Sequence, residues 1–409
     1  MRILVLFVWM GISIAGMAQR IATFETDLSK KTNDLDVPVS VNLDPITFDA
    51  DSTLTLSLIE GTKRTPIPFQ ISRGPSRQIH WTIPATASTK KISFELSKGK
   101  MTPSESMKAG RVNGELTIQS GDKNLLRYVY KMVYPPAGQD SAYRRNGFIH
   151  PLWTPSGKIL TRIQAPDHYH HYGIWNPWTH VLFEGDTVDF WNIKGKQGTV
   201  RFSRFVSVTE GPIFAEFAAL HEHVVFKKNG KEKVALNELQ TVRVYKPGAK
   251  GDYYIADITI QLNCAGTSPF KILEYRYAGM GWRATEKWNQ SNSEAMTSEG
   301  KTRKDADGTT ARWFYYQGPL DAAYGGAEMM SYPSNYNFPE PLRIWPENSN
   351  NGEVFAMFAP TKNKDWLLEP GKIYTLKYRF VVYDGHFSKE KADRAWSNYA
   401  MPPVVAIKK

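Results

Sequence analysis

The sequence predicts an all-β protein, with a small N-terminal β-sandwich followed by a large antiparallel β domain of two stacked sheets. Many short segments alternate apolar and polar residues, as in Val37–Val41 and Tyr254–Ile260, and this two-residue period is typical of half-buried strands. Turns rich in Gly and Pro separate these segments, as in sandwiches. Long amphipathic helical patterns are absent from the sequence. These observations favour sheets packed on sheets.

Composition changes divide the chain into three parts after its first 18 residues. Residues 19–100 contain repeated short strand patterns and no polar cluster, which predicts a small β-sandwich with a packing or presentation role. Residues 101–112 are polar and include Pro103, so we predict a linker there. Residues 113–409 form the large β domain.

The large domain is expected to contain many strands and one short helix. The helix is predicted over Lys389–Trp396, where Ser388 can cap its start and Ala392 and Ala395 share a face with Trp396. The clearest strand patterns are Leu116–Ile118, Tyr128–Tyr130, Thr199–Phe202, Phe214–Phe217, Thr241–Tyr245, Tyr254–Ile260, Val354–Phe358 and Tyr374–Phe380.

Residues 1–18 have the pattern of a secretory signal peptide. Arg2 supplies the positive start, Ile3–Ala15 is the apolar run, and Gly16–Ala18 offers small residues for cleavage before Gln19. The apolar run is too short for a mature transmembrane helix, and no second one follows. We therefore expect a periplasmic or secreted protein that does not span the membrane.

Charge and cysteine content narrow the function further. The formal net charge is +11, but the basic residues are scattered without a long Lys/Arg run, so nucleic-acid binding is not expected. Cys264 is the single cysteine. An intramolecular disulfide is therefore excluded, and a secreted chain of this length must depend on a large core.

The stretch Asp167–Trp175 concentrates the candidate chemistry. It holds three of the nine histidines, His168, His170 and His171, and His150 lies in a second motif upstream. In a strand, His168 and His170 would project to one face, so they are candidate ligands of a divalent metal, with a carboxylate or His150 as the third ligand. A bend at Gly173 would instead bring all the histidines of the stretch into one pocket beside Trp175 or Trp178.

Metal-free acid–base catalysis is the alternative use of these histidines. Imidazole titrates near neutral pH, so His150, His170 and His171 are candidate catalytic residues. The candidate carboxylate partners are Asp167, Glu184, Asp189 and Glu274. Outside the cluster, structural hydrogen-bonding roles are expected for His80, His221, His223 and His386.

The aromatic residues suggest a sugar ligand. Indole faces stack on the apolar faces of sugar rings, while Arg and amide groups bind the hydroxyls. The alternative reading of the same residues is packing in the core. The candidate substrate-binding residues are Trp175, Trp178, Trp282, Arg283 and Trp345.

Two motifs, Ile149–Gly157 and Asp167–Trp175, resemble the signature of the PmoA-like family. These are exported bacterial proteins, frequent in glycan-degrading Bacteroidetes and often labelled methane oxygenase. The resemblance covers about residues 113–390, and Tyr172 stands where many members carry Arg. It implies carbohydrate metabolism, and the large domain is similar in size and pattern to the galactose-mutarotase-like supersandwich.

These observations leave three functions open. The first is a carbohydrate-active enzyme, a hydrolase, lyase or epimerase with a histidine-rich site. The second is a non-catalytic glycan-binding protein that uses the same aromatic residues. The third, implied by the label of the resembling family, is a metal-dependent oxygenase. The density of titratable groups favours an enzyme.

Overall fold

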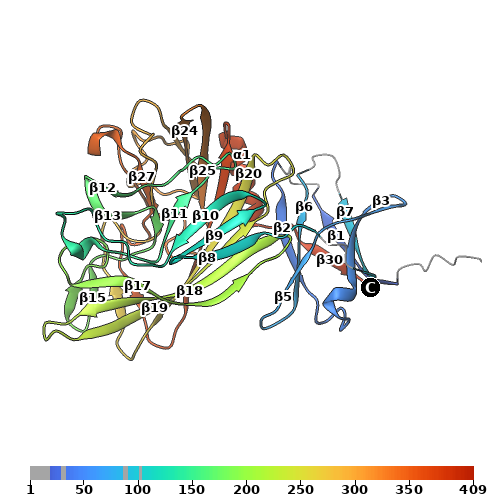
Figure 1. Ribbon diagram of the computed structural model, residues 1–409, viewed down its shortest axis with the longest axis horizontal. Coiled ribbons are helices and arrows are strands. Elements are labelled where there is room, and N and C mark those ends of the chain that lie inside the picture. Colours follow the sequence, from blue (N-terminus) through green and yellow to red (C-terminus); the bar gives the residue numbers. More distant parts are fainter. Residues whose placement is uncertain (1–18, 29–33, 86–90, 101–103) are drawn as a thin grey trace, which may run out of the picture.

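The computed structural model describes residues 19–28, 34–85, 91–100 and 104–409. The all-β prediction is confirmed, because antiparallel sheets make up most of the structure and only one α-helix is present in the described residues. Figure 1 shows an N-terminal lobe on the right and a larger C-terminal lobe on the left. The expected signal peptide lies outside the described residues. None of the helices in the described ranges has the length and apolar character needed to cross a membrane.

The N-terminal lobe is a sandwich of a five-stranded and a three-stranded sheet. Their inward-facing residues, among them Phe24, Trp81 and Phe94, form one apolar core. The five-stranded sheet has the order β30-β1-β7-β3-β4 and the other the order β2-β6-β5. The strands are β1 (Arg20–Asp27), β2 (Val37–Asn42), β3 (Leu54–Glu60), β4 (Lys63–Pro66), β5 (Gln70–Ser72), β6 (Gln78–Ile83), β7 (Lys91–Lys98) and β30 (Val405–Lys408), with a 3-10 turn η1 (Asp51–Thr53).

Strand β30 differs from the predicted domain layout, which placed all residues after 112 in the large domain. It returns to the N-terminal lobe and pairs with β1, from Thr23 opposite Lys408 to Thr26 opposite Val405. Without β30, β1 would be an edge strand with unpaired backbone groups. Pairing of these groups is the physical reason for the return of the chain.

The C-terminal lobe is built on two eight-stranded antiparallel sheets that enclose the main core. The first, called the site sheet, contains β26 (Leu342–Ile344), β27 (Phe355–Phe358), β22 (Gly281–Arg283), β14 (Ile174–Trp175), β11 (Phe148–Leu152), β10 (Lys123–Val129), β9 (Glu115–Ser120) and β8 (Lys108–Val112), in this order. The second, called the long sheet, contains β17 (Gly198–Thr209), β18 (Phe214–Phe226), β19 (Glu232–Tyr245), β20 (Tyr253–Cys264), β29 (Tyr374–Asp384), β25 (Ala323–Ser331), β24 (Trp313–Leu320) and β23 (Glu294–Thr297), in this order.

Smaller elements extend these sheets. A hairpin joins β12 (Ile163–Ala165) to β13 (His168–Tyr172), and a four-stranded sheet contains β16 (Asp186–Val188), β15 (Val181–Phe183), β21 (Phe270–Ile272) and β28 (Trp366–Leu368). Two 3-10 turns are η2 (Ser141–Tyr143) and η3 (Asn350–Gly352). The predicted helix is confirmed as α1 (Lys389–Ala400), where the Ser388 hydroxyl accepts a hydrogen bond from the Lys391 backbone N–H.

The expected linker is shorter than predicted. Residues 108–112 form β8, which pairs with β9, and Met107 forms a bridge with Gly211. β8 is an edge strand of the site sheet, and four of its five residues are exposed. The sequence therefore predicts a linker where the structure has an exposed edge strand.

Buried polar contacts join the two lobes. The Gln70 side-chain carbonyl of β5 accepts hydrogen bonds from the backbone N–H groups of Ile213 and Phe214, each at 3.1 Å. The Tyr253 hydroxyl accepts a bond from the Asp36 backbone N–H at 2.7 Å. Because these groups are held across the boundary, the lobes present one continuous structure.

Candidate functional site

Strand alternation divides the side chains of the site sheet between its two faces. Ile149, Ile174 and Trp282 pack into the core between the two large sheets. Trp175 and Arg283, their neighbours on β14 and β22, face the other way, because successive side chains of a strand point to opposite faces. The outer face thus carries a second set of buried rings, here called the outer aromatic cluster: Phe148, Tyr172, Trp175, Trp191, Trp345 and Phe355.

The β12–β13 hairpin brings the three clustered histidines onto this outer face. Ile163 pairs with Tyr172 and Ala165 with His168, so three residues of β13 lie opposite one residue of β12. Such a bulge ends the alternation of a regular strand. As a result the rings of His168, His170 and His171 all contact one another, with centroid separations of 5.4, 4.7 and 4.6 Å.

Gly173 allows β13 to cross closely over β11. Its φ is +57°, and a Cβ at this position would lie 2.2 Å from the Ile149 carbonyl oxygen. Only glycine fits both the left-handed backbone and this approach. The bend expected at Gly173 is therefore present, and it places His171 beside Trp175, with ring centroids 5.3 Å apart.

His171 lies deepest of the three histidines and is 1% exposed. Its ring stacks on Phe355 at 4.9 Å and packs against Trp345 at 5.5 Å. Burial, together with the neighbouring His170 and Arg283, lowers the pKa of His171 well below its ordinary value. The ring is therefore neutral at physiological pH and serves as part of the packed floor of the site.

His170 lies nearer the surface, beside two tyrosines. Burial lowers the pKa of His170 to about 3, with a smaller contribution from His168. Its ring stacks on Tyr143 of η2 at 6.4 Å, and Tyr143 in turn contacts Tyr169 at 5.9 Å. Both tyrosines are half-buried, so they form an aromatic rim next to a neutral imidazole.

Asp167 and His168 form a hydrogen-bonded carboxylate–imidazole pair. The Asp167 Oδ2 atom lies 2.9 Å from His168 Nδ1. Arg283 donates to both oxygens of the same carboxylate from Nη2, at 2.9 and 3.0 Å. Burial alone would raise the pKa of Asp167, but the hydrogen bonds from His168 and Arg283 outweigh it and hold this pKa well below its ordinary value.

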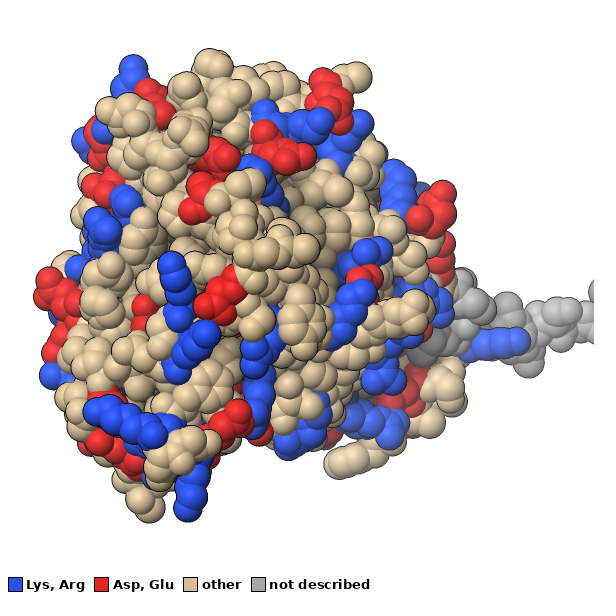
Figure 2. Space-filling model, turned by 60° about the vertical axis from the view of Figure 1, so that its left-hand side comes forward, with Lys and Arg blue, Asp and Glu red and all other residues tan. Residues whose placement is uncertain are grey.

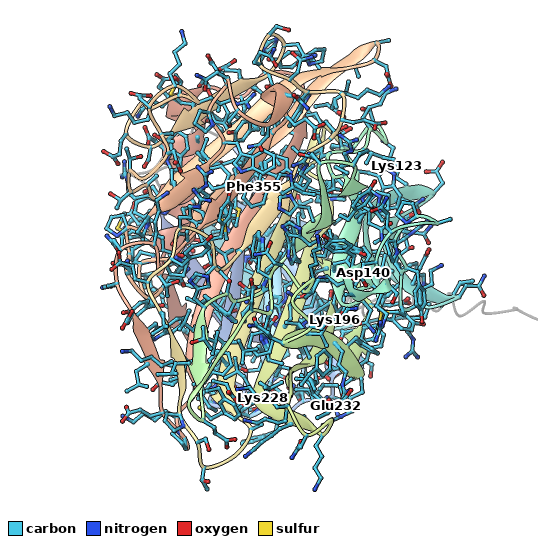
Figure 3. All side chains as sticks on the ribbon, turned by 90° about the vertical axis from the view of Figure 1, so that its left-hand side faces the viewer. Lys123, Asp140, Lys196, Lys228, Glu232 and Phe355 are labelled. Carbon is cyan, nitrogen blue, oxygen red and sulfur yellow. The ribbon has the colours of Figure 1, made fainter. Side chains whose placement is uncertain are left out.

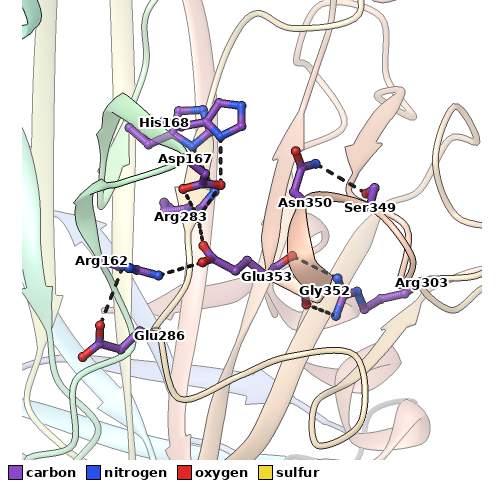
Figure 4. Close-up of polar contacts among 11 residues, drawn as sticks. Arg162, Asp167, His168, Arg283, Glu286, Arg303, Ser349, Asn350, Gly352 and Glu353 are labelled. Atoms are coloured by element: carbon purple, nitrogen blue, oxygen red, sulfur yellow. Dashed lines mark hydrogen bonds and ion pairs between the residues drawn. The ribbon is translucent and has the colours of Figure 1, made fainter.

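Arg283 anchors a chain of charges that continues away from His168 (Figure 4). Its buried guanidinium lies over the Trp345 ring at 4.7 Å and also pairs with Glu353. Glu353 contacts Arg162 at 3.1 Å, and Arg162 contacts Glu286 at 3.8 Å. A buried charge is stable only when it is paired, so each member depends on the next.

The far end of this chain of charges borders a cavity of about 610 Å³. Its lining includes His150, Arg162, Glu286, Lys287 and Asp321. His150 Nδ1 lies 2.9 Å from the Thr161 hydroxyl, and burial, followed by the charge of Arg127, lowers the pKa of His150 to about 4. His150 thus belongs to the cavity rather than to the three-histidine group.

Comparison with known sequences adds a family to this geometry. The sequence pattern of DUF6807, described as a family of unknown function, matches residues 115–397. The chain belongs to this family. No curated protein matches the sequence. The DUF6807 region contains every residue of the site described above.

Three solved structures are similar to this chain at low identity. An α-mannosidase from Enterococcus faecalis has a TM-score of 0.48 and 8% identity over 96% of this chain and 47% of its own, so the chain spans about half of its length. A galactose mutarotase related enzyme from Lactobacillus acidophilus has a TM-score of 0.33 and 8% identity over 68% of this chain and 97% of its own. The heparan sulfate lyase HepC from Pedobacter heparinus has a TM-score of 0.29 and 11% identity over 71% of this chain and 38% of its own.

The four tryptophans predicted to bind substrate are all buried. Trp178 and Trp282 lie in the core between the sheets, and Trp282 donates its indole N–H to the Leu160 carbonyl. Trp175 and Trp345 lie in the outer aromatic cluster beneath the histidines. The structure therefore differs from the prediction that these indoles face a ligand, because packing against other rings already covers their faces.

Glu274 and the proposed metal pair are not supported by the geometry. The Glu274 side chain is exposed and makes no hydrogen bond or ion pair with any residue that the structure describes. In the described ranges, no group of three or more His, Cys, Asp or Glu side chains is arranged to hold a metal ion. His168 and His170 thus lack the third ligand that the metal hypothesis requires.

Three important members of the site were not predicted from the sequence. Arg162 lies in the chain between the two histidine motifs, whereas Glu353 lies far from both, and Glu353 pairs with Arg162 and with Arg283. Tyr143 was also missed, although it lies only a few residues before the first motif. The sequence signal available for them was their charge or aromatic character alone, which is common over the whole chain.

The remaining histidines include a buried pair in the main core. His221 and His223 flank Glu238, at 3.2 and 3.0 Å, and His221 also contacts the Tyr128 hydroxyl. Burial would raise the pKa of Glu238, but bonds with both histidines lower it to about 2. Glu238 lies on the neighbouring strand β19 and Tyr128 on β10 of the site sheet, so the expected structural role takes the form of a side-chain network. Glu184 pairs with Lys227 and Lys233, and Asp189 accepts from the backbone of Trp191, so neither meets the clustered histidines.

Proposed function

We propose that this protein is a carbohydrate-active enzyme in which His168 is the acid–base catalyst. The observation that carries the proposal is the Asp167–His168 pair, with 2.9 Å between Oδ2 and Nδ1. A carboxylate bonded to Nδ1 fixes the proton on that nitrogen and leaves Nε2 free to accept one from a substrate. Arg283 keeps the carboxylate ionised and in place. A binding protein has no need of such a pre-oriented base.

The sugar class is supported by the half-buried rings next to His170, whose own ring contacts that of His168. Tyr143 and Tyr169 offer flat faces with polar hydroxyl tips, and Tyr143 stacks on His170. Flat aromatic faces accept the C–H faces of sugars, and imidazole nitrogens exchange hydrogen bonds with hydroxyls. The sequence resemblance to PmoA-like proteins, with its setting in glycan degradation, agrees with this assignment.

The proposed reactions share one step. A hydrolase, a lyase and an epimerase all move a proton at the sugar, and His168 supplies the group that takes or gives it. His170 positions hydroxyl groups, while His171 keeps the floor of the site rigid. The adjoining cavity, with His150 in its wall, would hold further sugar units.

The test is turnover of a panel of oligosaccharides by the purified protein and by His168→Gln. We expect product with the wild-type protein and a loss of about a hundredfold or more in rate for the variant. His386→Gln is the matched control, because His386 is exposed and stacks only on Tyr324. Binding without product in every case would favour the glycan-binding alternative. Product formation that requires added metal and oxygen would favour the oxygenase alternative.

We further propose export with cleavage after Ala18. The motivation is the charged, apolar and small-residue order of residues 1–18. Amino-terminal sequencing of the periplasmic fraction should give Gln19 as the first residue. A chain from the cytoplasmic fraction that still begins at Met1 would contradict the proposal.

A further inference from the structure

A second cavity, of about 510 Å³, borders the turn η2. Ser141, Ala142 and Arg144 line it, whereas Tyr143 from the same turn packs against His170. The two sites therefore share one short turn. A ligand of several units that contacts Tyr143 lies within reach of this cavity as well.

The lining of this cavity has more cationic than acidic side chains. Its lining includes five cationic side chains and one acidic residue, Glu232: the cations are Arg144, Lys196, Arg201, Lys227 and Lys231. Figure 3 shows Lys196 between Asp140 above and Glu232 below on this side of the lobe. In Figure 2, Lys and Arg side chains lie beside Asp and Glu side chains in the lower half of the face shown. A concave surface lined by one sign of charge concentrates the field and attracts ions of opposite sign.

Two of these five cations have no acidic partner among the described residues. Arg201 pairs with Glu222 and Glu232, Lys227 with Glu184, and Lys196 with Asp140 at 3.4 Å. Arg144 donates to the Ser141 carbonyl of its own turn, and no described carboxylate pairs with it or with Lys231. These two groups are therefore free to pair with a ligand, and the guanidinium offers a planar fork that matches a carboxylate or a sulfate.

We propose that this cavity binds the acid group of a negatively charged saccharide, a carboxylate or a sulfate ester. The saccharide part of this inference rests on the proposed function, whereas the anion part does not. The cationic cavity selects acidic chains, and the turn η2 connects the bound acid group to the site of His168. Glu232 opposes the anion through its own charge and by occupying Arg201.

The experiment measures binding of an oligogalacturonate, of a neutral gluco-oligosaccharide of equal length and of inorganic sulfate, by calorimetry at low salt. We expect the acidic chain to bind more tightly than the neutral one, and sulfate alone to bind weakly. The double variant Arg144→Gln, Lys231→Gln should bind the acidic chain about tenfold more weakly than the wild type. Glu232→Gln should bind the acidic chain more tightly, an effect that a general loss of structure would not produce.

A matched control separates the cavity from overall charge. Lys63→Gln with Lys91→Gln removes the same charge from exposed positions of the N-terminal lobe, and it should leave binding unchanged. Equal weakening in both double variants, or equal binding of acidic and neutral chains, would overturn the proposal. His168→Gln should still bind the acidic chain. A wild-type protein that binds the acidic chain but turns over no oligosaccharide would refute the proposed function alone.

Discussion

Asp167 and His168 are adjacent in the sequence, and their pairing depends on a third residue more than a hundred positions away. Arg283 holds the Asp167 carboxylate from Nη2, with a sequence separation of 116 residues. The carboxylate is therefore ionised, and it orients the imidazole by charge as well as by geometry. Removal of the Asp167 charge should therefore lower the rate of proton transfer more than it lowers the stability of the fold.

We expect Asp167→Asn to lower kcat by about a hundredfold or more, because the amide does not hold the proton of His168 on Nδ1 with the same preference. Rates on the active oligosaccharide and a thermal melt measure the two effects separately. Asp305→Asn is the control, since Asp305 pairs with Lys301 at an exposed site. A variant with full activity would show that Asp167 does not orient the base.

The sequence does not show how deeply a single side chain is buried. The histidine group and Asp167 were recognised because they are neighbours in the chain. Trp178 and Trp282 have the same composition signal as ligand-binding tryptophans, yet they lie in the core. The sequence shows which residues precede and follow a tryptophan in its own strand. The rings that pack on its indole come from strands distant in the sequence, so its burial cannot be predicted.

At the scale of elements, local patterns were reliable where one strand or helix suffices. The alternating segments became strands, and Ser388 caps α1 as its hydroxyl chemistry suggests. The bulge of β13 was not predictable, because it is defined by the register against β12. Residues 108–112 showed no clear strand pattern, since an exposed edge strand has few apolar positions to mark it.

The cap of α1 leads to an element-scale prediction. Ser388→Ala should lower the free energy of unfolding by about 1 kcal/mol, because the first turn loses the acceptor for the Lys391 N–H. Ser397→Ala, within the same helix, is the control and should be neutral or slightly stabilising, since Ala is the better helix former. Urea unfolding of both variants measures the two free energies of unfolding. Equal decreases in the two variants would mean that the Ser388 hydroxyl does not act as a cap.

At the scale of the whole molecule, buried neutral histidines should make the protein sensitive to acid. Burial lowers the pKa of His80 and of His150 to about 4 and that of His170 to about 3, and it also lowers the pKa of His171 and His223. The unfolded chain takes up these protons near pH 6.5 whereas the folded chain does not, so stability is lost as the pH falls from about 6.5 toward these values.

We expect the free energy of unfolding to fall between pH 7 and pH 5, with a limiting slope of about 1.4 kcal/mol per pH unit for each such histidine. His150→Gln should flatten the curve, while His386→Gln, at an exposed site, should run parallel to the wild type. The measurement is urea unfolding at several pH values. Parallel curves for all three proteins would show that His150 is not buried in its neutral form.

The two lobes are joined by more than the connecting segment. A protease site inserted between residues 100 and 104 should yield two pieces that separate in a denaturing gel but elute together from a sizing column. We expect this because β30 stays paired with β1 and Gln70 stays bonded to Ile213 and Phe214. Deletion of residues 405–409 in the same protein is the comparison, and it should weaken the association. Separate elution of the intact pieces would mean that the lobes are independent domains.

The pairing of β30 with β1 also sets an order of events during synthesis. Glu25 of β1 and Lys408 of β30, which form an ion pair, are separated by 383 residues. The sheet that contains β1 therefore keeps one edge uncovered until residues 405–408 have emerged from the ribosome. At about 5–20 residues per second this interval lasts tens of seconds. Throughout it the exposed edge of β1 is open to pairing with other chains, so the nascent protein has a period of vulnerability that the finished molecule lacks.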